Sequence, residues 1–159
     1  MQQLSNTEKY EVYKSLHGNL AKAMKLGFYY QAIFIEYAIA EDRCKSALRH
    51  AGVKFENSRG FELKLSEKIR KLRDNAVFCA RYPRSRLPLS LLDELMEWKR
   101  DRDGLVHALV NRPYNDEALR EVAERGKRIT DQLSTRVRSV NNYFRKMNVP
   151  EEKDKEETT

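Results

Sequence analysis

Apolar residues recur at three- and four-residue steps in five long segments of the chain, the spacing that places them on one face of an α-helix. These segments run from about Thr7 to Met24, Phe28 to His50, Phe61 to Ala80, Pro88 to Val110, and Asp116 to Met147. Residues 52–60 are expected to form a loop, and residues 81–88, which hold two prolines, are expected to form a linker. The pattern predicts an all-α fold, an up-and-down bundle of about five helices with no sheet.

The second segment is the most apolar part of the chain. From Phe28 to Ala40 it is hydrophobic nearly all round, which is typical of a helix at the centre of a bundle. Glu36 lies inside this stretch. A carboxylate there needs a partner or an opening to water, because burying an unpaired charge is costly.

Length and charge suggest a single basic domain. The chain has 159 residues, of which 40% are hydrophobic, and we place one domain at residues 1–149. The charged segment 150–159 is expected to be a disordered tail. The net charge is +7, and residues 151–159 carry −3, so the rest of the chain carries +10. A basic body favours a polyanionic partner such as nucleic acid, although many helical proteins are basic without one.

Membrane and metal chemistry are not indicated. The chain has no apolar run long enough to span a membrane, and its first residues lack the apolar core of a signal peptide. We therefore expect a soluble, cytoplasmic protein. Its two cysteines, Cys44 and Cys79, belong to no Cys/His cluster and are expected to be core side chains. No metal site and no cofactor are predicted.

The residues that suggest chemistry lie in the segment WKRDRDGLVHALVNRPY, residues 98–114. Arg102 falls within an apolar stripe of its helix, so it needs a partner or a polar cleft. That stripe consists of Leu91, Leu95, Trp98, Leu105 and Leu109. His107 lies about 140° round the helix from Arg102. Asp103 precedes His107 by four residues, so the two side chains share a face and could form a hydrogen bond, and Arg100 lies near the same face.

The run Arg-Asp-Gly-Leu-Val-His, from Arg102 to His107, resembles the signature of the HEPN superfamily, an arginine followed after four to six residues by a histidine. In that family the residue after the arginine is often Asn, Asp or His, and Asp103 fits. The helix pattern of residues 7–147 also resembles the family's bundle, with the helix that holds Glu36 as the long central one. Members paired with a nucleotidyltransferase can carry a tyrosine two residues after the histidine, where this chain has Leu109.

This resemblance implies metal-independent cleavage of RNA by a homodimer that brings two motifs together, in a toxin or an antiphage effector. It also implies an antitoxin or a nucleotidyltransferase as a possible partner. Histidine titrates near neutral pH and can move protons, while arginine keeps its charge and can stabilise a phosphorane. The expected catalytic residues are Arg102, His107 and Asp103, supported by Glu36 and Arg100, with Lys68, Lys71 and Lys99 as RNA contacts.

Two other interpretations stay open. The chain could be a noncatalytic module of the same fold that binds RNA, a nucleotide or a protein partner. It could also be a helical interaction protein without a nucleic-acid role, in which Arg102 only forms a core ion pair with Glu36 or another acid. Cleavage that depends on His107 would indicate the ribonuclease. RNA binding without cleavage would indicate the noncatalytic module.

Overall fold

The computed structural model describes residues 4–111, 113 and 115–148 of the chain. Within these residues the chain forms seven helices and no strand, with one isolated bridge between Glu56 and Glu62. The helices are α1 (Asn6–Leu26), α2 (Tyr29–His50), α3 (Leu65–Asp74), α4 (Ala76–Cys79), α5 (Arg81–Arg86), α6 (Leu89–Ala108) and α7 (Asp116–Met147). The expected all-α fold is confirmed. The expected tail at residues 150–159 lies outside the described residues.

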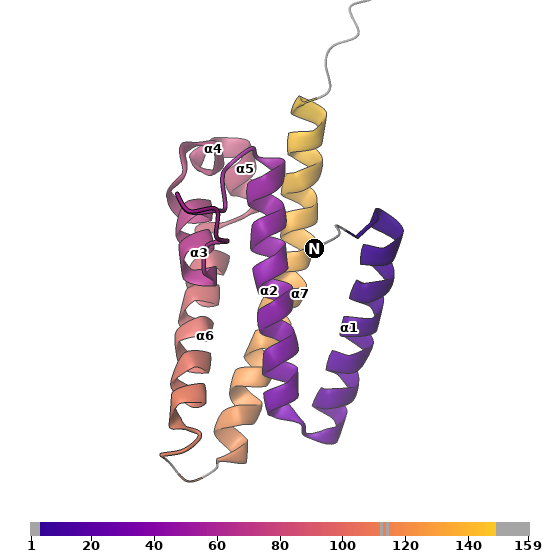
Figure 1. Ribbon diagram of the computed structural model, residues 1–159, viewed down its shortest axis with the longest axis vertical. Coiled ribbons are helices and arrows are strands. Elements are labelled where there is room, and N and C mark those ends of the chain that lie inside the picture. The colour runs from indigo at the N-terminus through magenta and orange to yellow at the C-terminus, as the bar shows by residue number, and fades with distance from the viewer. Residues whose placement is uncertain (1–3, 112, 114, 149–159) are drawn as a thin grey trace, which may run out of the picture.

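The long helices α1, α2, α6 and α7 lie side by side, and each runs opposite to the long helix before it (Figure 1). The most extensive contact joins α2 to α7, so these two helices form the centre of the bundle. Helix α1 packs against α2, and α6 packs against α7 and α3. The short helices α4 and α5 lie at one end of the bundle (Figure 1).

Local chemistry sets both ends of α1. Ser5 accepts a hydrogen bond from the backbone N–H of Glu8 at 3.3 Å, and the Glu8 carboxylate accepts one from the Ser5 N–H at 2.7 Å. This reciprocal pair satisfies donors that a helix start leaves without partners. At the other end Gly27 adopts a left-handed conformation (φ 73°), which glycine reaches without steric cost. The chain can therefore turn sharply into α2.

The third helix is shorter than the expected span from Phe61 to Ala80. The Leu63 N–H donates to the Phe55 carbonyl at 2.8 Å and the Asn57 N–H donates to the Phe61 carbonyl at 2.8 Å. These bonds hold residues 55–63 in a loop, so α3 begins only at Leu65. It ends before Asn75, whose extended backbone interrupts the helix and whose side chain caps α4.

The expected linker at residues 81–88 is in fact helical from Arg81 to Arg86. Pro83 is the third residue of this helix. A proline there removes no helical hydrogen bond, because the first N–H groups of any helix have no partner within it. Pro83 and Leu87 are both buried, so they fasten the short helix to the bundle.

The hydrophobic core is formed mainly by α2, α6 and α7. Trp98 of α6 is fully buried, and its indole N–H donates to the Val122 carbonyl of α7 at 3.0 Å. Cys44 is a core side chain, as expected, but Cys79 is exposed at the end of α4. None of the described helices combines the length and the apolar character needed to cross a membrane.

Candidate functional site

Arg102 points from α6 towards α2. Its guanidinium group lies 4.3 Å from the ring centroid of Tyr37 and forms an ion pair with Asp103 at 3.1 Å. Its side chain is 22% exposed, so it sits at the edge of the core and not within it. No ion pair joins Arg102 to Glu36 among the described residues, so the core ion pair between these two residues that the sequence left open does not form.

Asp103 forms contacts on its own helix with Lys99 and Arg102 and not with His107. Burial tends to raise the pKa of the Asp103 carboxyl group, but hydrogen bonds from Lys99 and Arg102 outweigh it and lower that pKa. The expected hydrogen bond to His107 is absent from the described structure. Lys99 also lies four residues from Asp103, and its ammonium group forms an ion pair with the carboxylate that was expected to bind His107.

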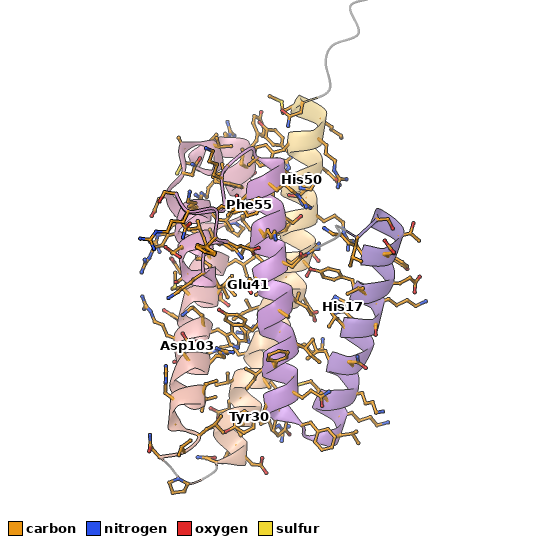
Figure 2. All side chains as sticks on the ribbon, in the orientation of Figure 1. His17, Tyr30, Glu41, His50, Phe55 and Asp103 are labelled. Carbon is orange, nitrogen blue, oxygen red and sulfur yellow. The ribbon has the colours of Figure 1, made fainter. Side chains whose placement is uncertain are left out.

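His107 lies in the last turn of α6, where it is exposed and has no hydrogen bond or ion pair with a described residue. It lines a groove of about 1430 Å³ between the end of α6 and the start of α7. Tyr30 of α2 also lines this groove, at the end of α2 that is lower in Figure 2. Arg100 lines it as well, so the structure brings Arg100 and His107 to one surface.

The groove contains charges of both signs. Arg125 of α7 forms an ion pair with Asp101 of α6 across it. Arg100 forms no ion pair with a described residue. Three further acids line the side formed by α7, namely Asp116, Glu117 and Glu121. The groove is therefore not a simple basic channel, and Arg102 is not among its lining residues.

Comparison of the chain with protein-family models, with curated proteins and with solved structures finds no match. Among the described residues, no group of three or more His, Cys, Asp or Glu side chains is placed to hold a metal ion.

Glu36 is completely buried in α2, and neither oxygen of its carboxyl group has a hydrogen-bond partner among the described residues. Burial raises the pKa of this group to about 8, while Lys127 lowers it and Asp131 raises it to smaller extents. Near neutral pH the group is therefore mostly protonated. Glu36 was expected to need a partner or an opening to water. Instead, its carboxyl group is buried in the uncharged form.

Gly126 of α7 makes room for this carboxyl group. A Cβ atom at that position would overlap Glu36 Oε2 and lie 2.6 Å from the indole nitrogen of Trp98. The importance of Gly126 was not predicted from the sequence. A glycine in the middle of a long helix is the signal that could have drawn attention to it, because glycine disfavours a helix interior.

The three lysines expected to bind RNA have internal partners. Lys68 is fully buried and forms ion pairs with Glu62 and with Glu41, the second at 3.5 Å. It is therefore not available as an RNA contact, because the side chain that looked solvated on α3 faces α2 (Glu41 is labelled in Figure 2). Lys71 donates to the Lys54 carbonyl at 2.9 Å and Lys99 pairs with Asp103.

Proposed function

We propose that this protein is a HEPN-type endoribonuclease that cleaves RNA as a homodimer without a metal ion. His107 moves protons, and Arg102 stabilises charge at phosphorus. The observation that carries the proposal is an exposed apolar surface on α6 between these two residues.

That surface is centred on Val106. At about 100° per residue, Val106 lies about 40° round α6 from Arg102, and His107 lies about 140° from it. Val106 is 42% exposed and Val110, just past the helix, is 92% exposed. A second copy of the chain that covered these valines would also lie over Arg102 and His107. A two-fold axis there brings Arg102 of the partner subunit towards His107.

The chemistry requires only these two side-chain types. His107 accepts the proton of an RNA 2′-hydroxyl group, whose oxygen then bonds to the adjacent phosphorus while the bond from phosphorus to the 5′-oxygen breaks. The leaving 5′-oxygen takes up a proton from water and His107 releases its proton to the solvent, which gives a 2′,3′-cyclic phosphate and a 5′-hydroxyl group. Arg102 offers two N–H groups to the phosphorane oxygens, where negative charge develops.

A noncatalytic RNA-binding module is the second candidate. It is favoured by the contacts of Arg102 with Tyr37 and Asp103, which give this arginine a structural role, and by the commitment of Asp103 to Lys99. In that case His107 is an exposed surface residue, and RNA is bound but not cut.

Cleavage of a labelled single-stranded RNA in EDTA separates these candidates. His107→Ala is expected to lower the rate at least ~100-fold, the usual contribution of a general acid–base residue. His17→Ala, on the distant helix α1, is the matched control and should leave the rate unchanged. Arg102→Ala should lose a similar factor, and its thermal stability must be measured alongside, because the variant also loses the contact with Tyr37.

Cleavage of a 2′-deoxy substrate at the same rate, or activity that survives His107→Ala, would contradict the proposed mechanism. RNA binding by the wild-type protein without any cleavage would favour the noncatalytic module.

A further inference from the structure

A second cleft lies at the other end of the central helices. It has a volume of about 670 Å³ and is formed by the start of α1 and the C-terminal halves of α2 and α7. His50, one of its lining residues, lies at the opposite end of α2 from Tyr30 (Figure 2). The basic side chains that line it are Lys9, Arg43, Arg49, Arg138 and Arg145.

Asp42 is the single acid among the described lining residues, and it already forms an ion pair with Arg43. It accepts hydrogen bonds from the Tyr13 hydroxyl group and from Arg43, the second at 2.8 Å. Burial opposes ionisation of Asp42, but these two hydrogen bonds outweigh it and lower the pKa of its carboxyl group. Asp42 therefore compensates Arg43 and, in part, Lys9, whose charge also lowers the pKa of Asp42; Arg49, Arg138 and Arg145 are left without a counter-charge among the described residues.

Three arginines of the cleft lack an acidic partner. Arg49 and Arg138 form no salt bridge with a described residue. Arg145 contacts no acid among the described residues; its partners are the Asn142 side chain at 3.5 Å and His50 Nε2 at 3.3 Å. Like charges gathered in one cleft repel one another and create a local positive potential, which an anion relieves.

Asn141 adds a buried polar group to the same cleft. Its side chain is 5% exposed; the amide nitrogen donates to Ser46 Oγ at 3.0 Å, while Oδ1 has no partner among the described residues. Asn141 therefore has an unsatisfied buried acceptor beside the cleft.

We propose that this cleft binds a small oligophosphate anion, with two or three linked phosphate groups. The planar guanidinium groups of Arg49, Arg138 and Arg145 match pairs of phosphate oxygens. Three uncompensated arginines suit a ligand that concentrates several negative charges in a small volume. The cleft has the size of a small-molecule site. An RNA strand spreads its charge along its length, one per phosphate, and fits this arrangement less well.

Isothermal titration of the full chain with sodium tripolyphosphate tests the proposal. We expect one ion to bind per chain at low ionic strength. Arg138→Glu should weaken binding at least ~10-fold, since one charge-assisted contact becomes a repulsion. Arg136→Glu is the matched control: it makes the same charge change two residues away, about 200° round α7 and outside the cleft, and should have little effect.

ATP and AMP, titrated in parallel, identify the source of the phosphates. Equal affinity for ATP and tripolyphosphate shows that the linked phosphates suffice. Tighter binding of ATP shows that a nucleotide carries them, and weak binding of AMP is expected in both cases. Each result supports the oligophosphate site.

Three results would overturn it. The first is no binding of tripolyphosphate, or binding no tighter than that of sulfate at matched ionic strength. The second is binding that persists in both Arg138→Glu and Arg49→Glu. The third is tighter binding of an RNA oligonucleotide without a terminal phosphate that is lost in Arg138→Glu, which would make the cleft a nucleic-acid contact. Loss of this site would leave RNA cleavage at His107 untouched, because the two sites lie at opposite ends of the bundle.

Discussion

Glu36 links the stability of the bundle to pH. In the folded protein its buried carboxyl group has a pKa of about 8, compared with 4.5 for the group in the unfolded chain. The unfolded chain therefore loses this proton near pH 4.5, while the folded protein keeps it until about pH 8. The contribution of Glu36 to stability is fully present below pH 4.5 and is lost as the pH rises to about 8.

Glu36→Gln should therefore stabilise the protein in a pH-dependent way. At pH 8 we expect the free energy of unfolding to exceed that of wild type by on the order of 2–4 kcal/mol, and near pH 5 the difference should be small. Urea denaturation at several pH values between 5 and 8 measures it. Glu11→Gln, on the exposed surface of α1, is the control. A difference between Glu36→Gln and wild type that does not change with pH would contradict the buried, protonated state.

Lys68 has a structural role in the packing of α3 against α2. Lys68→Ala removes a buried side chain and leaves Glu62 and Glu41 without their shared cation. We expect a loss of about 1–3 kcal/mol in the free energy of unfolding, because both carboxylates are partly exposed and can be hydrated again. Lys71→Ala, on the same helix, should cost much less. Similar small losses in the two variants would contradict the buried position of Lys68.

At the scale of the helix, two glycines give opposite expectations. Replacing glycine by alanine inside a helix normally stabilises it by about 0.5–1 kcal/mol. Gly18 of α1 has open space where a Cβ would lie, so Gly18→Ala should show that gain in thermal denaturation. Gly126→Ala should instead destabilise the protein by about 1–3 kcal/mol, because the new methyl group overlaps Glu36 and crowds Trp98.

The same pair tests how α2 and α7 are coupled. In the double variant Glu36→Ala/Gly126→Ala, the shortened side chain at position 36 leaves room for the methyl group. The cost of Gly126→Ala should therefore shrink in that background, which a double-mutant cycle measures directly. Additive costs would show that the two positions do not meet in the core.

At the scale of the whole molecule, the exposed end of α6 predicts a dimer. Val106→Asp places a charge in the proposed interface, so the variant should be monomeric under conditions in which wild type is dimeric, and its RNA cleavage should fall together with the dimer. Light scattering at micromolar concentrations reports the mass. Val77→Asp is the matched control, since Val77 is 40% exposed and Val106 is 42% exposed, but Val77 lies on α4. A wild-type protein that is monomeric at these concentrations would remove the basis for a shared site.

The sequence alone determined the helical class, the four long helices and the central place of α2. These features depend on neighbours three or four positions apart, so the spacing of apolar residues and local caps such as Ser5 and Gly27 record them directly. The limits of α3 were missed, because hydrogen bonds between residues 55–57 and 61–63 compete with the helix.

Only the tertiary structure decided which polar side chains are free. Lys68 looks like a surface residue on its own helix, and only packing against α2 shows that it is buried. The space that Gly126 leaves for Glu36 and the basic cleft between α2 and α7 both join residues about ninety positions apart. Helical periodicity reports which face of each helix is apolar, but the packing of distant segments determines which charges meet in the folded chain.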